Sequence, residues 1–271
     1  MLKIIRALLR FLPTAIAANL TIFFAMFPRK FPLNDRGREA LAQASIINFN
    51  RKGRRVAYSW GDGPLVILVH GWEGCAAQMA PIAMRLADQG YQAVALDVRG
   101  HGESEGKRTN FWDFQEDIAG LTQHMDRPVH AYVCHSAGGL LMMAARYRKL
   151  IKANYYVALA SPRGPYPPLD IIKKMLKVTQ PVIDRCQVYV AKQFDCPWPE
   201  LLAGEMFQYQ DQGKCLLIYD ENDKLVDHTD ADKILKYWPE ARLIKTNNYN
   251  HSSLLWSPEV LDEVPNFLSG A

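Results

Sequence analysis

The sequence has few cysteines, and they form no pattern that would build a disulfide framework or a zinc site. There are five, an odd number at irregular spacing, with no CxxC pair and no adjoining histidine cluster. Disulfide-rich secreted domains and structural zinc sites both need regular cysteine spacing, so the sequence argues against both. Isolated cysteines of this kind are typical of a reducing compartment, which favours a cytoplasmic location.

An excess of charge of one sign is also lacking. Lys and Arg number 32 against 28 Asp and Glu, which leaves a net charge of only +4 on 271 residues. The basic residues are mixed with acidic ones rather than gathered in a stripe, which argues against a nucleic-acid partner. With 49% hydrophobic residues the composition is that of an ordinary globular protein, and the length suits one large α/β domain.

A hydrophobic run long enough to cross a bilayer is missing too. The uncharged stretch over residues 11–27 is short for a spanning helix and is interrupted by Pro13 and Asn19. Three basic residues precede it, so residues 1–27 fit a signal peptide or a short span, an amphipathic segment on a membrane face, or helices packed on the protein's own surface. These interpretations stay open. They bear on location, cytoplasmic with or without membrane association, and not on chemistry.

From residue 54 onward, strand-like and helical segments alternate. The apolar runs predict strands over 56–60, 65–69, 91–96, 130–134, 155–159, 215–219 and 241–245, and helices over 77–89, 111–125, 138–149 and 258–268. Such alternation predicts a mostly parallel, doubly wound sheet with helices on both faces.

The long connection between the 155–159 and 215–219 strands sets the domain organisation. Residues 162–213 are too many for a simple crossover and are expected to form a small helical cap over the carboxyl ends of the strands. We therefore divide the chain into an apolar, helical N-terminal extension, an α/β core and the inserted cap. Their ranges are 1–50 for the extension, 51–161 and 214–271 for the core, and 162–213 for the cap.

A candidate nucleophile lies between a buried strand and a helix, in the stretch Cys134-His135-Ser136-Ala137-Gly138. A serine at such a sharp turn projects its hydroxyl above the sheet, in the pattern G-x-S-x-G. Here Cys134 replaces the first glycine. Ser136 is the candidate nucleophile, and the alternative interpretation is a serine that caps the helix.

A nucleophilic serine needs a base, and in this architecture the chain order is serine, acid, histidine. Two histidines, His228 and His251, follow the serine with an acid available between. His251 comes after the last predicted strand and before the last helix, from where its imidazole can reach Ser136. His228 is expected at a helix start, exposed to solvent. The acid is one of three aspartates after the 215–219 strand, Asp220, Asp223 and Asp227.

Backbone donors for a tetrahedral intermediate are expected from two loops. The stretch His70-Gly-Trp-Glu-Gly74 directly follows the first buried strand, and its Trp72 N–H is one candidate. The N–H of Ala137, the residue after the nucleophile, is the other. His70 precedes the serine in the chain and is interpreted as structural.

The ordered segments HGWEG, LDVRGHGES, CHSAGG, DENDKLV and NYNHSS resemble the α/β-hydrolase superfamily. Within it, the chain looks most like capped bacterial serine hydrolases of the esterase, lipase and acylglycerol-lipase type. The resemblance covers the chain from about residue 54 to the end. It implies the α/β-hydrolase fold, no metal or organic cofactor, and Asp223 as the acid that orients His251. The departures are Cys134 and the asparagine before His251, where relatives carry glycine.

The hypothesis is a serine hydrolase that cleaves carboxylic esters of small-molecule or lipid acyl substrates through an acyl-enzyme. Amide or peptide hydrolysis is the alternative, and an aminopeptidase would need acids such as Glu200 or Glu205 facing Ser136. A membrane-surface lipase or acyltransferase, attached through residues 1–27, is a further alternative. A non-catalytic binding module would require a broken triad.

Overall fold

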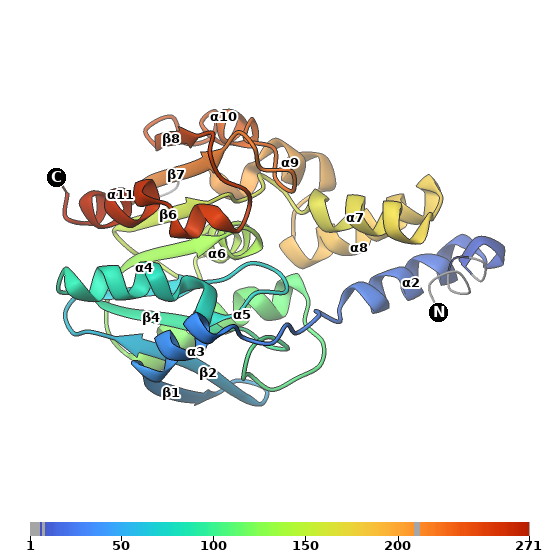
Figure 1. The fold of residues 1–271 in the computed structure, drawn as a ribbon. Helices are drawn as coiled ribbons and strands as arrows, with labels where there is room; N and C mark the ends of the chain where they lie inside the picture. The colour runs from blue at the N-terminus through green and yellow to red at the C-terminus, as the bar shows by residue number, and fades with distance from the viewer. Residues whose placement is uncertain (1–5, 7–8, 209–211, 271) are drawn as a thin grey trace.

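The computed structural model describes residue 6 and residues 9–208 and 212–270. These residues contain an eight-stranded sheet with the order β1-β2-β4-β3-β5-β6-β7-β8 (Figure 1). The strands are β1 (Ser45–Asn50), β2 (Arg54–Trp60), β3 (Leu65–Val69), β4 (Gln92–Asp97), β5 (Val129–His135), β6 (Tyr155–Leu159), β7 (Lys214–Asp220) and β8 (Arg242–Thr246). β2 is antiparallel to β1 and β4, and the pairs from β4 to β8 are parallel. The predicted mostly parallel sheet is confirmed.

Helices cover both faces of this sheet (Figure 1). α4 (Ala76–Asp88) and α11 (Pro258–Leu268) pack on one face, and α5 (Phe111–Met125) and α6 (Ala137–Tyr147) pack on the other. The reason is visible in β3, where all five side chains are buried. Alternate residues of a strand point to opposite faces, so its apolar run contributes to two separate cores.

The sheet begins earlier in the chain than the sequence analysis placed it. Residues 45–50 were assigned to the N-terminal extension, but they form β1, which pairs along its whole length with β2. An edge strand needs to bury one face only, and here Phe49 is buried while Ile46 is exposed. Two asparagines interrupt the apolar pattern, which is why the strand is hard to recognise in the sequence. α3 (Asp35–Ala42) precedes it.

The connection between β6 and β7 is helical in the described residues. It contains α7 (Tyr166–Leu176), α8 (Gln180–Phe194), α9 (Trp198–Ala203) and the 3₁₀ helix η1 (Glu205–Phe207). The start of this connection is held to α10 (Asp230–Ile234) by the fully buried Asp230. Asp230 pairs with Arg163 and accepts a hydrogen bond of 2.7 Å from the Tyr166 hydroxyl. The cap is thereby attached to the core beside its entry point.

α2 (Thr14–Ala25) packs on the cap helices α8 and α7, and the three helices project together from the body of the molecule (Figure 1). We call α2, α7 and α8 the helical arm. The face of α2 toward α8 is made of Ala17, Ala18 and Ile22, small or apolar residues that are buried. Within the described residues, no helix is both long and apolar enough to cross a bilayer. Residues 1–5 and 7–8 of the predicted amphipathic segment lie outside the described part of the chain.

Candidate active site

Ser136 occupies a strained turn between β5 and α6. Its φ of 53° and ψ of −126° are sparsely populated for a residue with a side chain. The Ser136 N–H donates to the Leu159 carbonyl at the end of β6, at 2.8 Å, which fixes the turn to the next strand. The turn also needs a small residue at position 138, because a Cβ on Gly138 would lie 2.4 Å from the His70 carbonyl oxygen.

The cysteine that replaces the first glycine of the pattern is accommodated without backbone strain. Cys134 lies inside β5, outside the left-handed region, and its side chain is fully buried. Burial raises the pKa of the Cys134 thiol well above its ordinary value, so the sulfur stays a neutral core group. The strain of the turn therefore falls on Ser136.

Three of the predicted site residues form a continuous hydrogen-bonded chain. The Oγ of Ser136 lies 2.8 Å from Nε2 of His251, and Nδ1 of the same ring lies 2.7 Å from Oδ2 of Asp223. The Asp223 side chain is only 1% exposed. Its other oxygen, Oδ1, accepts from the backbone N–H groups of Leu225 and Val226 at 2.8 and 3.1 Å. One carboxylate oxygen is thus held by its own loop while the other faces the imidazole.

Asp220 joins the loop of Asp223 to the loop of His251, a role that the sequence analysis did not assign. Its Oδ2 accepts hydrogen bonds from the Thr246 hydroxyl and from the Asn248 and Tyr249 N–H groups, and its Oδ1 accepts from the Asn222 N–H. Burial alone would raise the pKa of Asp220, but these hydrogen bonds outweigh it and the pKa is lowered. Its position at the end of a buried strand is the only sequence signal for this role.

The His251 loop has two further supports. Asn250 Oδ1 accepts from the N–H groups of Ser252 and Ser253, which begins the short helix η2 (Ser253–Trp256). His135 Nε2 lies 2.9 Å from the His251 carbonyl oxygen and, as the protonated nitrogen, donates to it. Burial lowers the pKa of His135 to about 3, so its ring is neutral. Both residues that replace a glycine of the family pattern therefore have a structural role: Cys134 packs in the core, and Asn250 holds the start of η2.

The loop after β3 lies directly against the serine. A Cβ on Gly71 would come within 3.3 Å of Ser136 Oγ. The N–H groups of Trp72 and Ala137 have no hydrogen-bond partner among the described residues, so both remain available to a ligand. They stay the predicted pair of oxyanion donors, one from each loop.

Two buried histidines hold this loop in place. His70 Nδ1 lies 2.6 Å from the Gly71 carbonyl oxygen, and its Nε2 accepts from the Val98 N–H. His101 Nε2 accepts from the Glu73 N–H at 3.0 Å. Burial lowers the pKa of both rings, that of His101 to about 3. Among the described residues, neither ring forms a hydrogen bond with Ser136, and the contacts of His70 are those of the structural role predicted for it.

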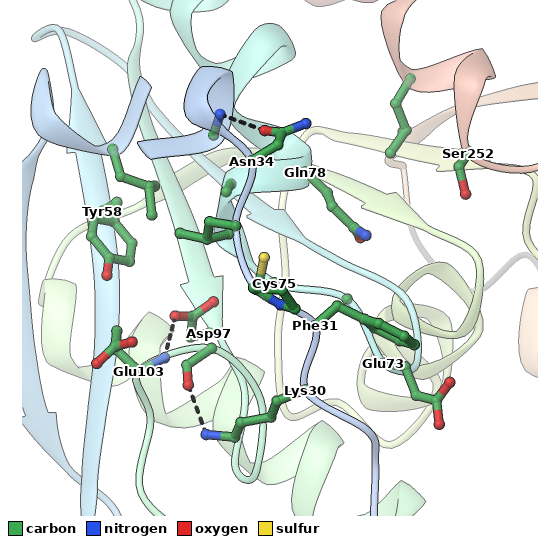
Figure 2. Close-up of a pocket in the computed structure, with 18 of the residues that line it drawn as sticks. Lys30, Phe31, Asn34, Tyr58, Glu73, Cys75, Gln78, Asp97, Glu103 and Ser252 are labelled. Atoms are coloured by element: carbon green, nitrogen blue, oxygen red, sulfur yellow. Dashed lines mark hydrogen bonds between the residues drawn. The ribbon is translucent and has the colours of Figure 1, made fainter. Parts of the chain in front are cut away.

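Two cavities lie on either side of this loop. The first, which we call the apolar groove, has a volume of about 380 Å³ and is bounded by the helical arm and by Trp72 and Phe111. The second, about 400 Å³, is more polar and lies between α3, the neighbouring strands β2 and β4, and the Ser252 loop (Figure 2). The polar groups of the second cavity are used within the fold: Asp97 accepts from the Ala76 and Glu103 N–H groups. The apolar groove is the better candidate for a substrate site.

No group of three or more His, Cys, Asp or Glu side chains in the described part of the chain could hold a metal ion. The two cap acids named as a possible amine site, Glu200 and Glu205, line neither cavity. Glu205 instead accepts a hydrogen bond from Tyr147, at the far end of α6 from Ser136.

Comparison with known proteins identifies the family. Residues 63–206, more than half of the chain, match the model of a hydrolase family described as serine aminopeptidase, S33. The chain belongs to this family. Solved α/β-hydrolases share the fold of this S33-family hydrolase. An esterase from Pyrococcus furiosus, for example, superposes with a TM-score of 0.67 at 18% identity, over 90% of this chain and 98% of that one. The α/β-hydrolase fold expected from the sequence is confirmed.

Curated relatives of the S33-family hydrolase match over shorter stretches. The 2-(acetamidomethylene)succinate hydrolase of Mesorhizobium japonicum is 35% identical over 97 residues, which is 34% of each chain. A monoacylglycerol lipase of Mycolicibacterium smegmatis is 37% identical over 93 residues, 31% of this chain and 33% of that protein. The chain thus spans about a third of the length of the curated relatives it matches.

Proposed function

We propose that this S33-family hydrolase cleaves carboxylic esters by way of an acyl-enzyme. Ser136 Oγ attacks the acyl carbon while His251 takes its proton, and His251 then gives that proton to the leaving alcohol. Water, activated by the same imidazole, breaks the acyl–Ser136 bond and releases the carboxylic acid. Asp223 holds the ring in the required tautomer, and the Trp72 and Ala137 N–H groups bind the oxyanion. The observation that carries the proposal is the hydrogen-bonded chain from Ser136 through His251 to Asp223.

The apolar groove supports an ester with a hydrocarbon acyl chain. It runs from Trp72, the proposed oxyanion residue, along side chains such as Phe111, Leu169 and Ile172. Apolar walls bind methylene groups but offer little to a polar or charged substrate. The similarity to a monoacylglycerol lipase over part of the chain agrees with this substrate class.

Removal of an N-terminal amino acid is the competing activity, and the charges near the site favour it less. An aminopeptidase needs a free carboxylate to hold the substrate amine. Glu73 is the acid within the loop that carries Trp72, and its carboxylate is already paired with Arg29 through two hydrogen bonds of 2.9 and 2.7 Å. Glu205 is bound to Tyr147 at the end of α6, about 15 Å of helix away from Ser136.

The nucleophile can be tested with a fluorophosphonate probe, read out by intact-protein mass. We expect one adduct on the wild-type chain, none on Ser136→Ala, and one on Ser269→Ala, a matched change at an exposed serine. Labelling of Ser136→Ala, or none on a folded wild type, would contradict the proposed nucleophile.

The substrate class can be tested with p-nitrophenyl esters of increasing acyl length and the matching amino-acid p-nitroanilides. We expect ester hydrolysis to exceed anilide hydrolysis, with the highest kcat/KM for medium or long acyl chains. Ala25→Trp, which places a large side chain in the apolar groove, should lower kcat/KM for the long esters and spare the acetate ester. Faster cleavage of the anilides would instead support the aminopeptidase.

A further inference from the structure

The outward face of α2 is apolar and exposed to solvent. Ile16, Leu20 and Phe23 are 48%, 36% and 42% exposed, although the opposite face of the helix packs on α8. No charged residue occurs between residues 11 and 28. Apart from Thr14, Asn19 and Thr21, α2 is apolar. A mostly apolar helix that is buried on only one side leaves a face available to a further partner.

This exposed apolar surface extends over the rest of the helical arm. On α7 it includes Ile171 and Met175, and on α8 Val188 and Tyr189. Ten of the fourteen large apolar side chains that are exposed in the described residues lie on the arm or at Phe11 and Phe27, beside the two ends of α2. We call these ten the docking face. Their concentration in a small part of the chain marks an interaction surface and not the scattered exposure of an ordinary protein.

The charge around the docking face has one sign. Among the described residues, 6, 9–27 and 166–194 contain seven basic and two acidic side chains, a net charge of +5, whereas the whole chain has +4. The rest of the molecule is therefore slightly acidic. Lys173 and Lys174 lie on α7 between Ile171 and Met175, so exposed cations are interleaved with exposed apolar groups. Apolar side chains bordered by cations suit the surface of an anionic bilayer.

The mouth of the apolar groove lies within the docking face. Five side chains are both exposed and part of the groove wall: Phe24, Phe27, Ile171, Met175 and Tyr189. The same groove is also lined by Trp72, in the loop after β3. A continuous apolar path therefore connects the outer surface of the arm with the loop that lies against Ser136.

We propose that the docking face binds the surface of an anionic lipid bilayer, and that acyl chains of bilayer lipids enter the apolar groove directly from it. The arm would lie in the interface without spanning the membrane, since its helices are too short to cross. The substrate part of this inference rests on the proposed ester hydrolysis, but the binding part does not.

Binding is tested with the full chain carrying Ser136→Ala, so that the lipids stay intact. The probe is vesicles of phosphatidylcholine and phosphatidylglycerol in equal parts, with phosphatidylcholine alone for comparison. We expect cosedimentation with the mixed vesicles, weaker binding without the anionic lipid, and about a tenfold loss of binding for I16Q/L20Q/F23Q. These three side chains do not line the groove. The matched control is Ile46→Gln on β1, an isoleucine that is more exposed than Ile16 and far from the arm (Figure 1).

A charge-reversal pair provides a second test that leaves the apolar residues in place. K173E/K174E should weaken binding to the mixed vesicles, whereas K152E/K236E, with the same change in net charge away from the arm, should not. Undiminished binding by both arm variants would overturn the inference, as would equal losses in their controls. The Ser136→Ala chain could instead form a dimer without vesicles and fail to bind vesicles. If I16Q/L20Q/F23Q then abolished the dimer, the docking face would be assigned to a second copy of the chain.

Turnover separates this inference from the proposed function. In a chain that keeps the native Ser136, I16Q/L20Q/F23Q should hydrolyse p-nitrophenyl acetate at the wild-type rate. The same variant should lose most of its activity on vesicle lipids. Normal acetate hydrolysis without vesicle binding would refute the membrane proposal alone. Vesicle binding by a chain that hydrolyses no ester would refute the ester hydrolase alone.

Discussion

At the scale of single residues, the carboxylate of Asp223 has two separate tasks, one for each oxygen. Oδ1 is fixed by two backbone N–H groups of its own turn, and Oδ2 faces Nδ1 of His251. An amide at this position would keep the shape of the side chain but could present an N–H to the ring. The imidazole would then hold its proton on the nitrogen that faces Ser136, and it could no longer act as a base.

We therefore expect Asp223→Asn to lower kcat for ester hydrolysis by about 10⁴-fold with little change in KM or in the melting temperature. Asp227→Asn is the matched control, because the side-chain hydrogen bonds given for Asp227 among the described residues stay within its own turn, to Thr229. Steady-state kinetics on both variants checks the prediction. A loss below tenfold for Asp223→Asn would remove this residue from the proposed triad.

Cys134 offers a test of the elbow itself. Its side chain is packed in the core and its backbone is unstrained, so restoring the more common glycine removes apolar contacts and adds freedom to the unfolded chain. We expect Cys134→Gly to lower the free energy of unfolding by about 2 kcal/mol, measured in urea, and to leave kcat nearly unchanged. A marked rise in kcat would mean that the cysteine does distort the turn.

At the scale of elements, the candidate active site depends on hydrogen bonds between the loops that follow β7 and β8. Asp220 illustrates this, since it receives four hydrogen bonds from two loops that are separated in the chain. We expect Asp220→Ala to lower the free energy of unfolding by about 3 kcal/mol, because one buried hydroxyl and three part-buried N–H groups lose their acceptor. It should also lower kcat, since Asp223 and His251 lose their common support. Full activity in this variant would show that the two loops are held in other ways.

The elements also show how far the sequence could be interpreted. The buried strands were predictable because each contains a run of mostly apolar residues, which in β3 is the whole strand. Ser136 and His251 were predictable because a fixed chain order accompanies the strand–turn–helix pattern. β1 was missed because an edge strand buries only one face. The hydrogen bonds by which Asp220 joins two loops depend on contacts between distant segments, and so does the packing of α2 on α8. No local sequence pattern predicts such contacts.

At the scale of the whole molecule, buried neutral histidines make stability depend on pH. Burial lowers the pKa of His101 and His135 to about 3, whereas in the unfolded chain each titrates near 6.5. Between these values the unfolded state binds protons that the folded state does not. The contribution of these rings is therefore fully present above about pH 6.5 and is lost as the pH falls toward 3.

We expect the free energy of unfolding of the wild type to fall more steeply than that of His101→Gln over this range. The difference in slope should be about 1.4 kcal/mol per pH unit, from one proton. Urea titrations of both proteins from pH 7 to pH 4 measure it, and other titrating groups cancel because the two chains share them. Parallel curves would show that His101 is protonated in the folded state.

The strained conformation of Ser136 has a consequence for how the amount of folded protein can be measured. Its turn is fixed by the end of β6 through Leu159, and it lies against the loop after β3 at Gly71. These two supports and the His251 loop come from distant parts of the chain, so the proposed activated serine can form only after all of them have assembled. Under the proposed function, the share of a purified sample that takes up a covalent probe at that hydroxyl would therefore measure the share of molecules that are folded.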